Sequence, residues 1–505
     1  MLVHEFLIRS ASQFPQKTAL VCGEKRFTYA ELDAMSNRLG RALAQGGVQR
    51  GDRVAIHLHN SVEAVAGIFA ILKAGAAFVF INASTKPDKL TYILNNCRAK
   101  ALLMDGRLGN AEDLLSAVPS LGQVVVSGPK PAPADSRIRP YADIQAQSPA
   151  APLPTVNIDL DLACLIYTSG STGEPKGVMS DHSNVDFASS SIMTYLENRP
   201  DDIILSVLPL SFDYGLYQLL MAFKAGATLV LERTFMYPAA ILQRIQEERP
   251  TGFPGVPTVF AMLLQLDLSA FDLSSLRYIT NTAAALSPDK ILELQAAFPG
   301  VTLYSMYGLT ETKRTLYLPP DQLRIRPGSV GIPIPGTEAW VEDESGRRLG
   351  PGETGELVVR GRHVMRGYWE APEATAKRYR PGPLPGERLC YSGDLFRQDE
   401  EGYFYFISRK DDIIKCRGEK VAPKEVENVL HQLPGVTAVV IGVPDATAGE
   451  VVKAFIVANG HPLTEAEVIA HCRARLEDFM VPKYVEFRTE LPMTSSGKIS
   501  KLGLT

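Results

Sequence analysis

The stretch that decides the fold is YTSGSTGEPKG, residues 167–177, which follows an apolar run typical of a buried strand at 163–167. Its glycines allow backbone conformations that other residues avoid, so amide N–H groups can approach a ligand closely. Its hydroxyl side chains add donors and its lysine adds a positive charge. Such a loop suits an anion such as phosphate. The donor set is Thr168, Ser169, Gly170, Ser171, Thr172, Gly173 and Lys176.

This loop is not a Walker A motif. That motif needs Gly, four residues and then Gly-Lys-Ser/Thr, whereas Gly173 is followed by Glu-Pro-Lys. The late pair Gly497-Lys498 is followed by Ile499 and does not fit either. Taken alone, the composition favours an ordinary solvated turn, so other motifs must decide between a turn and a phosphate loop.

Size and composition indicate a soluble protein of at least two domains. The chain has 505 residues, 45% hydrophobic and 21% charged, with a formal net charge of −4. Nothing in this balance points to a nucleic-acid partner. The apolar stretch 64–83 contains Lys73 and Gly75, so we expect a helix over 62–73 and a buried strand over 77–81, and no membrane span.

The beginning of the chain and its cysteines favour a cytoplasmic location. MLVHEFLIRS has an acidic residue and lacks the basic-then-apolar layout of an export signal. The six cysteines are scattered singly, which predicts reduced, mostly buried thiols without disulfides. His57 and His59 lack ligand-spaced partners, so we interpret them as packing residues and not as a metal pair.

Helical periodicity and short β-branched runs alternate through most of the chain, for example 31–45 with 53–57 and 238–248 with 252–256. This pattern predicts an α/β fold with largely parallel sheets. The segment 127–154 is rich in Pro, Ala and Ser and is expected to be a surface connection. We expect a large N-terminal domain over 1–408, whose residues 336–408 form a β-rich, barrel-like subdomain, and a small α+β domain over 409–505.

Five further segments accompany the opening loop: SMYGLTET at 305–312, GELVVRG at 355–361, YSGDL at 391–395, SRKDDIIKCRGEKVAPKEVE at 408–427 and LPMTSSGKISK at 491–501. In this order and spacing they resemble the adenylate-forming enzymes, which include acyl-CoA synthetases, nonribosomal-peptide adenylation domains and luciferases. The resemblance spans almost the whole chain. It implies that ATP and a carboxylic acid give an acyl-adenylate and pyrophosphate, after which a thiol accepts the acyl group.

The resemblance also implies roles for individual residues. The loop from Thr168 to Lys176 would close over the β- and γ-phosphates of ATP, and Glu311 would help to hold Mg²⁺. Lys498 would bridge the substrate carboxylate and the α-phosphate, and the small domain would turn about Asp411 between the two half-reactions. The other implied nucleotide and thiol contacts are Tyr307 and Gly308 at the adenine, Thr310 at the α-phosphate, Asp394 at the ribose, Arg409 at the domain entrance, and Gly418 with Lys415 at the pantetheine arm.

The acid-binding pocket is expected to be narrow and to suit a small or medium acid. Asp213, in SFDYG, matches an aspartate that binds a substrate ammonium in amino-acid adenylation domains, but it would equally suit the cap of a helix beginning at Tyr214. These two interpretations stay open. The expected pocket residues are Phe212, Asp213, Tyr214, Tyr217, Asn281, Thr282, Ala283, Ala284 and Met306.

The expected partners are ATP, Mg²⁺, the acid, and either CoA or a separate acyl- or peptidyl-carrier protein, in a monomer or homodimer. The principal alternative is a stand-alone amino-acid adenylation enzyme that loads a separate carrier protein. A luciferase-like oxidation of the adenylate has no support in the sequence. A non-catalytic nucleotide-binding homologue is disfavoured because Lys498, Glu311 and Asp394 are all present.

Overall fold

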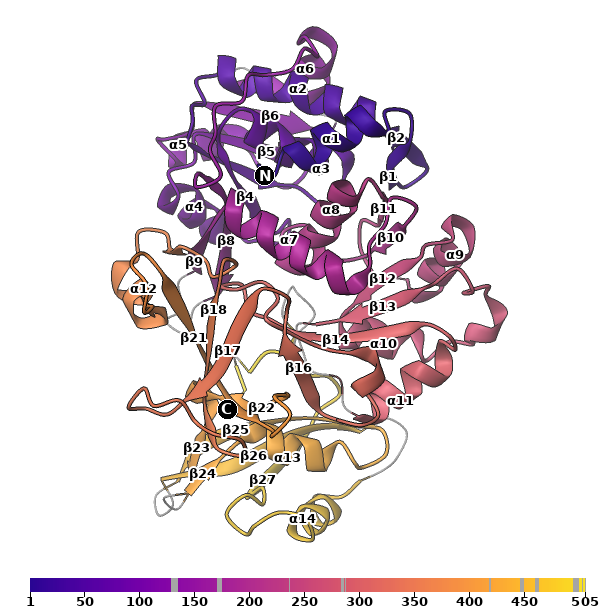
Figure 1. The fold of residues 1–505 in the computed structure, drawn as a ribbon, viewed down its shortest axis with the longest axis vertical. Coiled ribbons are helices and arrows are strands. Elements are labelled where there is room, and N and C mark those ends of the chain that lie inside the picture. The colour runs from indigo at the N-terminus through magenta and orange to yellow at the C-terminus, as the bar shows by residue number, and fades with distance from the viewer. Residues whose placement is uncertain are drawn as a thin grey trace.

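The computed structural model describes residues 1–128, 135–169, 175–235, 237–282, 286, 288–416, 419–445, 449–458, 463–493, 499–501 and 503–504. The chain forms three sheets with helices packed around them (Figure 1). Two large sheets and their helices take up the upper and middle parts of the view. The third, small sheet lies at the bottom and is built from the C-terminal segment.

The first large sheet has eight strands in the order β19-β9-β8-β4-β3-β5-β6-β7. The run from β8 to β7 is parallel, and β9 and β19 extend it antiparallel. Its strands are β3 (Arg53–His57), β4 (Ala77–Ile81), β5 (Ala101–Asp105), β6 (Gln123–Ser127), β7 (Ile138–Pro140), β8 (Leu162–Ser169), β9 (Pro175–Asp181) and β19 (Gly367–Tyr368). Its helices are α2 (Tyr29–Gln45), α3 (Val62–Lys73), α4 (Pro87–Asn96), α5 (Ala111–Ala117) and α6 (Tyr141–Gln147).

The second sheet has fourteen strands in the order β17-β18-β21-β22-β16-β15-β14-β13-β12-β10-β11-β1-β2, with β20 beside β21. Strands β14 to β1 are parallel, and the β-rich half from β17 to β15 is antiparallel. The first group of strands is β1 (Thr18–Cys22), β2 (Lys25–Thr28), β10 (Ile203–Ser206), β11 (Thr228–Leu231), β12 (Gly252–Gly255), β13 (Tyr278–Asn281) and β14 (Thr302–Tyr307). The second group is β15 (Leu316–Leu318), β16 (Ser329–Pro333), β17 (Thr337–Glu342), β18 (Thr354–Gly361), β20 (Tyr379–Pro381), β21 (Arg388–Gln398) and β22 (Phe404–Arg409).

The helices around this sheet are α1 (Glu5–Gln13), α7 (His182–Leu196), α8 (Asp213–Ala225), α9 (Pro238–Glu248), α10 (Pro257–Leu263), α11 (Pro288–Ala297) and α12 (Pro372–Arg378). The largest core lies between the two large sheets and includes the buried faces of α3 and α8. There Phe69 of α3 stacks on Phe223 of α8 with ring centres 5.4 Å apart. The predicted α/β fold is confirmed. The antiparallel strands are continuous with the parallel ones in this sheet and begin at β15, before residue 336, and the subdomain bounds 336–408 stay a prediction.

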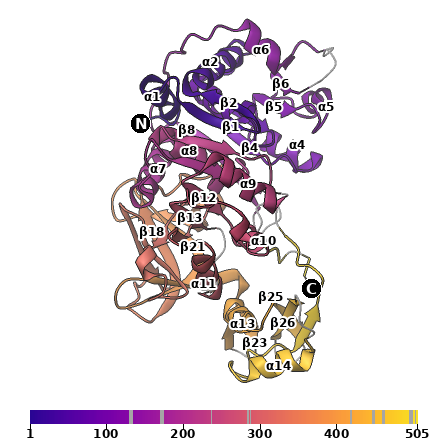
Figure 2. The same ribbon diagram turned by 90° about the vertical axis from the view of Figure 1, so that its right-hand side faces the viewer.

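The C-terminal sheet has the order β24-β23-β26-β25, with β27 beside β26, and it lies apart from the two large sheets (Figure 2). Its core is formed by its own strands and helices. The boundary at 408/409 stays a prediction. The elements are β23 (Ile414–Cys416), β24 (Glu419–Val421), α13 (Pro423–Leu430), β25 (Val436–Asp445), β26 (Gly449–Ala458), α14 (Glu465–Arg473) and β27 (Tyr484–Phe487).

Lys73, which interrupts the apolar stretch, is buried and forms an ion pair with Asp33. Its Nζ donates to Oδ1 of Asp33 at 2.6 Å, and to Ser36 and Asn37 on the same helix, α2. Helix α3 begins after Ser61, whose side chain accepts from the Ala64 amide, and ends at Lys73 as expected. No helix in the described ranges is both long and apolar enough to cross a membrane.

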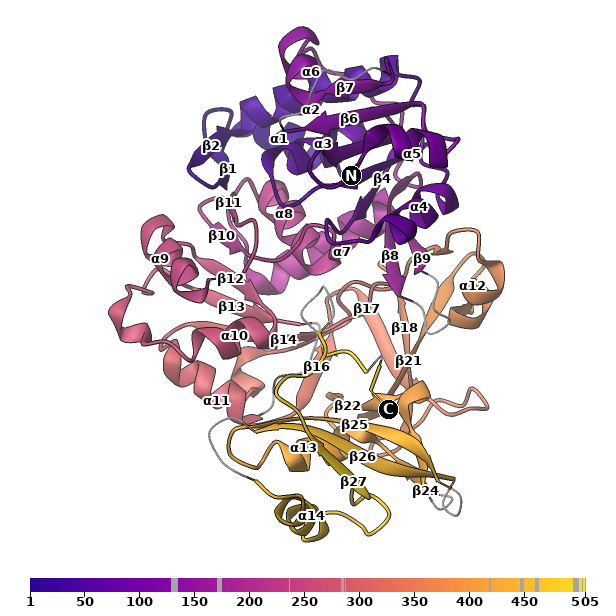
Figure 3. The same ribbon diagram turned by 180° about the vertical axis from the view of Figure 1, so that it is seen from behind.

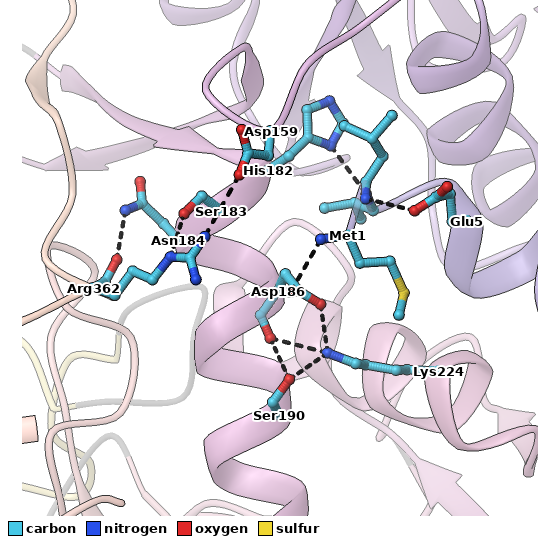
Figure 4. Close-up of polar contacts among 12 residues, drawn as sticks. Met1, Glu5, Asp159, His182, Ser183, Asn184, Asp186, Ser190, Lys224 and Arg362 are labelled. Atoms are coloured by element: carbon cyan, nitrogen blue, oxygen red, sulfur yellow. Dashed lines mark hydrogen bonds and ion pairs between the residues drawn. The ribbon is translucent and has the colours of Figure 1, made fainter. Parts of the chain in front are cut away.

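Helix α7 connects the N-terminal segment, α8 and the β-rich part (Figure 4). Asp186 forms an ion pair with Lys224 of α8 at 2.6 Å and with the Met1 ammonium at 3.4 Å. At the first turn of α7, Asn184 donates to the carbonyl of Arg362, whose guanidinium donates in turn to Ser183. These contacts fix the β-rich strands against the C-terminal end of β9, at the opposite end of that strand from Pro175 and Lys176.

One expectation for the chain course was wrong. The segment 127–154 is not only a surface connection, because it contains β7 and α6. Strand β7 pairs with β6, and Tyr141 and Ile144 of α6 are buried. Two apolar positions three residues apart are enough to hold a two-turn helix against a sheet, but they give too weak a periodic pattern to be seen in the sequence. All six cysteines are free thiols.

Candidate active site

The glycine-rich loop joins two antiparallel strands that bring its ends together. In the pairing of β8 with β9, Thr168 lies opposite Lys176 and Ser169 lies opposite Pro175. Both Thr168 and Lys176 are half-buried. The other predicted phosphate ligands, Gly170, Ser171, Thr172 and Gly173, lie outside the described residues. The hairpin therefore places a hydroxyl and an ammonium on facing strands at the base of the loop.

The second element of the site is the tight loop between β14 and β15, which carries Glu311. The Thr315 amide donates to the Tyr307 carbonyl at 2.9 Å and closes the loop. A Cβ at Gly308 would lie 1.8 Å from the Lys313 carbonyl oxygen, so only glycine fits at this close approach. Thr310 is half-buried at the turn, one residue before Glu311.

Glu311 and Lys176 converge on Tyr368, a residue of β19. The Tyr368 hydroxyl donates to Oε1 of Glu311 at 2.5 Å, and the Nζ of Lys176 lies 6.0 Å from the centre of the Tyr368 ring. The guanidinium of Arg378 lies 3.9 Å from the same carboxylate oxygen. The carboxylate predicted to hold a metal is therefore buried beside the base of the phosphate loop.

The third element is Asp394 on β21, which the predicted adenine residue Tyr307 contacts directly. The Tyr307 hydroxyl donates to Oδ2 of Asp394 at 2.6 Å, and Nε of Arg409 lies 3.9 Å from Oδ1. Burial raises the pKa of Asp394 above its ordinary value, while the Tyr307 hydrogen bond and the charges of Arg409 and Arg378 oppose that shift. The carboxylate is thus held ready as a hydrogen-bond acceptor.

The Tyr307 ring packs against the ring of Phe396. The ring centres lie 5.0 Å apart and the planes are inclined at 72°. Stacking of this ring on adenine stays a prediction. Arg409 is exposed at the end of β22, where it pairs in register with Asp394. The nucleotide residues named from the sequence thus come together from β21, β22 and the β14–β15 loop.

Tyr368 and Arg378 were missed by sequence reasoning. Tyr368 follows GELVVRG by a few residues, so the GYW segment gave a weak signal. Arg378 gave none, because a single arginine in AKRYR looks like any solvated charge. Only the folded structure brings Arg378, at the end of α12, close to the Glu311 carboxylate.

The short helical turn Lys410–Asp412 precedes the strands of the C-terminal sheet. Asp411, the predicted hinge, is exposed there, and Lys415 is exposed on β23 with its amide bound to Glu450. Gly418 and Lys498 lie outside the described residues. The chain on both sides of residues 494–498 is anchored: Met493 bridges to Ile499, and the Ser500 amide donates to the Pro492 carbonyl at 2.7 Å.

The expected acid pocket lies around the beginning of α8. Phe212 is the N-cap and Asp213 is the first helical residue, with no side-chain capping bond, so the interpretation of Asp213 as a cap is wrong. The hydroxyl of Tyr214 is bound to Thr280. The Met306 sulfur accepts from the Tyr195 hydroxyl at 3.0 Å. The remaining pocket residues Tyr217, Asn281 and Thr282 are buried, and Ala283 and Ala284 lie outside the described residues.

Comparisons with known proteins agree with this arrangement. The family of AMP-binding enzymes matches residues 7–369, and the C-terminal domain of AMP-binding enzymes matches residues 425–498. A feruloyl-CoA synthase from Amycolatopsis sp. is 36% identical, over 98% of this chain and 96% of its own.

Solved structures are similar over the full length. The crystal structure of an anthranilate CoA ligase in complex with anthranoyl-AMP has a TM-score of 0.90 at 31% identity, covering 99% of this chain and 95% of that one. An o-succinylbenzoate coenzyme A synthetase from Bacillus subtilis, in complex with ATP and magnesium ion, has a TM-score of 0.84 at 28% identity, with 98% of each chain covered. The chain therefore belongs to the AMP-binding enzymes, in which it is an ATP-binding, AMP-forming ligase of the acyl-CoA synthetase type.

Proposed function

We propose that this ligase uses ATP and Mg²⁺ to activate a small or medium carboxylic acid as its acyl-adenylate, and then transfers the acyl group to the thiol of CoA. The observation that carries the proposal is the convergence of Lys176 and Glu311 on Tyr368. It brings a phosphate-binding cation and a buried carboxylate to one place, beside the Tyr307–Asp394 pair.

The chain's own residues would divide the nucleotide between them. Asp394, an acceptor when ionised, suits the two ribose hydroxyls, and the backbone and hydroxyls of 168–176 suit the phosphates. Lys176 would offset charge on the departing pyrophosphate. Burial of this site strengthens each of these interactions, because the surrounding dielectric is low.

Glu311 is the residue that we propose for Mg²⁺. The ion commonly binds one or two carboxylates together with phosphate oxygens, where it neutralises charge. In the described ranges no group of three or more His, Cys, Asp or Glu side chains could hold a metal alone. A magnesium site that Glu311 and phosphate oxygens of ATP form together agrees with this absence. Tyr368 and Arg378 would keep the carboxylate oriented.

In the second half-reaction a thiol must reach the carbonyl of the acyl-adenylate. During the first half-reaction the site must exclude water from this same carbonyl. A small domain that turns about Asp411 would meet both needs in sequence, first bringing Lys498 and then the segment with Lys415 and Gly418. We propose CoA as the acceptor because the chain is similar to a feruloyl-CoA synthase and an anthranilate CoA ligase. The six free thiols fit a reducing, cytoplasmic location.

A second candidate is amino-acid activation with transfer to a separate carrier protein. It is supported by Asp213, which is 5% exposed and is not used as a helix cap. The two candidates share the first half-reaction and differ in the acid and the acceptor.

ATP–pyrophosphate exchange with a panel of aliphatic, aryl and amino acids, followed by trapping with CoA, tests the proposal. The Lys498→Ala variant should lose about 10²–10³-fold in exchange, because one preorganised donor is removed, yet still transfer a supplied acyl-adenylate to CoA. Lys483→Ala, which removes an exposed lysine of the same domain, is the control. Equal losses of Lys498→Ala in both assays would contradict the division of roles, and absence of exchange with every acid would contradict the function.

A further inference from the structure

Two neighbouring cations after Glu311 are buried without a counter-ion among the described residues. Lys313 and Arg314 follow Glu311 in the β14–β15 loop and are 1% and 4% exposed. In the part of the chain that the structure describes, neither has a carboxylate within 4.0 Å, and both the Nζ of Lys313 and the Nε of Arg314 lack a hydrogen-bond partner. The Nη1 of Arg314 reaches only the Lys313 carbonyl, at 3.5 Å.

Arg314 lies among residues that the sequence assigns to the acid pocket. Its guanidinium carbon is over the ring of Tyr214, 4.5 Å from the centre. Burial raises the pKa of Tyr217 well above its ordinary value; Cys164 and Asp213 raise it further and Arg314 lowers it. Arg314 and Asp213 therefore both lie within electrostatic reach of the Tyr217 hydroxyl, which is itself buried without a hydrogen-bond partner among the described atoms.

The buried positive charges of Lys313 and Arg314 are not balanced by the nearby carboxylates. Burial raises the pKa of the Cys164 thiol; Lys313 opposes this shift, while Asp181 and Asp213 strengthen it. Lys313 and Asp213 thus act on the same thiol with opposite sign and partly offset each other. Asp181 also has Arg366, 3.8 Å away. Two buried cations, Lys313 and Arg314, thus face a single unpaired carboxylate, Asp213, so one positive charge is in excess among the described side chains, and Arg314 is the cation that lies on a residue of the expected acid pocket.

A buried charge without a partner is costly, and a hydrophobic residue at such a position is often neutral or stabilising. Stability therefore does not explain an arginine at 314. An anionic ligand would explain it. A guanidinium that stacks on a ring keeps its N–H groups free along the edges of a fixed plane, and this geometry matches a carboxylate. The Tyr217 hydroxyl would supply one more donor to the same group.

We propose that Arg314 and Tyr217 bind a second anionic group of the substrate, so that the enzyme prefers a dicarboxylic acid, of which one carboxylate is adenylated and the other lies on Arg314. This proposal rests on the proposed function and names its substrate class. Arg314 is a specificity-determining residue in this scheme. A monocarboxylic acid of the same length would leave the guanidinium and the Tyr217 hydroxyl unmatched.

The test compares matched pairs of acids in ATP–pyrophosphate exchange with the full-length chain: butanedioate with butanoate, hexanedioate with hexanoate, and benzene-1,3-dicarboxylate with benzoate. We expect at least one dicarboxylic acid to exceed its partner about 100-fold in kcat/KM, since a site built for a polar group rejects the analogue that lacks it. Arg314→Met should reduce this ratio to near one without lowering the thermal midpoint. Arg314→Lys should retain part of the preference.

Arg324→Met removes an exposed arginine shortly after the same loop and serves as the control, for which the ratio should be unchanged. If every wild-type ratio is near or below one, the proposal is overturned while the proposed function stands. The dicarboxylate proposal is also overturned if an amino acid such as alanine is the best substrate and its exchange depends on Asp213 but not on Arg314. If Arg314→Met lowers exchange equally with both members of each pair, Arg314 has only a structural role and the proposal also fails. If no acid supports exchange, the proposed function itself fails.

Discussion

The Tyr307 hydroxyl and the Asp394 carboxylate lie 2.6 Å apart, and their hydrogen bond links the last parallel strand of the second sheet to the β-rich part. Tyr307 ends β14 and Asp394 lies on β21, so the residues predicted to bind adenine and ribose come from opposite halves of one fourteen-stranded sheet. Seen from behind, β14 and β21 both lie at about mid-height of the molecule (Figure 3). The predicted nucleotide site therefore depends on the packing of these two halves.

Tyr307→Phe keeps the ring but removes the hydrogen bond to Asp394. Because that bond lowers the pKa of Asp394, its loss raises the pKa further above the ordinary value. A smaller fraction of the carboxylate is then ionised at a given acidic pH, so activity should begin to fall at a higher pH than in the wild type. A bond to a charged group contributes about 1.5 kcal/mol or more, so the KM for ATP should rise about tenfold.

The measurement is the pH profile of kcat/KM for ATP. Tyr403→Phe, a tyrosine that contacts Arg326 away from the site, is the matched control. An acid limb at the same pH in both variants would show that Asp394 does not need its charge to bind ribose.

Glu311→Gln should abolish most of the adenylation. The amide is neutral and cannot provide the anionic oxygens that a hard cation prefers, so pyrophosphate exchange should fall about 10²–10³-fold and need more Mg²⁺ for saturation. Tyr368→Phe, which removes only the hydroxyl bound to Glu311, should have a smaller effect in the same direction. Exchange is measured across a magnesium titration. Glu344→Gln on an exposed turn is the control, and an unaltered magnesium dependence in Glu311→Gln would count against metal binding there.

Lys501 and Asp412 form an ion pair at 3.0 Å that ties the chain just after Lys498 to the turn containing the predicted hinge residue Asp411. Both side chains are about one-third exposed, so the pair contributes about 1 kcal/mol at most. Lys501→Met should therefore slow adenylation by up to about fivefold, and transfer from supplied acyl-adenylate should change less.

The double variant Lys501→Met with Asp412→Asn should be no slower than either single variant, because the same interaction is lost in each. The effect should also shrink at high salt. Lys483→Met, which breaks an exposed pair with Asp445 on the far strand of the small sheet, is the control. Additive losses in the double variant would show that the two residues act independently.

The sequence predicted elements best where local signals agree. Helices α3 and α9 have the expected bounds, because apolar periodicity, a capping serine or an N-terminal proline, and a glycine or proline shortly after the last turn coincide there. The element α6 lacked such agreement and was missed. The capping role of Asp213 depended on whether α8 begins at 213 or 214, a one-residue difference that no sequence pattern fixes.

The candidate site shows the same division. Motif residues such as Glu311 and Asp394 could be proposed as site residues from the sequence, because their neighbours in the chain are distinctive. Tyr368, Arg378 and Arg314 were not, because their importance lies in contacts across the fold, such as that between Tyr368 and Glu311, 57 residues apart in the chain. A buried charge without a partner is likewise visible only when all its neighbours are known.

Acid should destabilise the protein through its buried histidines, and His182 is the clearest case. Its Nδ1 accepts from the Val3 amide at 3.0 Å, and burial with the nearby His4 lowers its pKa from 6.5 to about 3 (Figure 4). The unfolded chain binds a proton below pH 6.5 and the folded chain does not, so stability is fully present above pH 6.5 and declines as the pH falls. At pH 5 the loss from His182 is about 2 kcal/mol.

His182→Asn keeps an acceptor for the Val3 amide but removes the titrating ring. Urea unfolding should therefore show a lower midpoint than the wild type at pH 7, because packing is lost, but a smaller further decrease between pH 7 and pH 5. Val185→Ala removes packing from the same helix without removing a titrating group, and its decrease between the two pH values should equal that of the wild type. Equal pH dependence in wild type and His182→Asn would show that His182 is already protonated in the folded protein at pH 5, against the direction of its pKa shift.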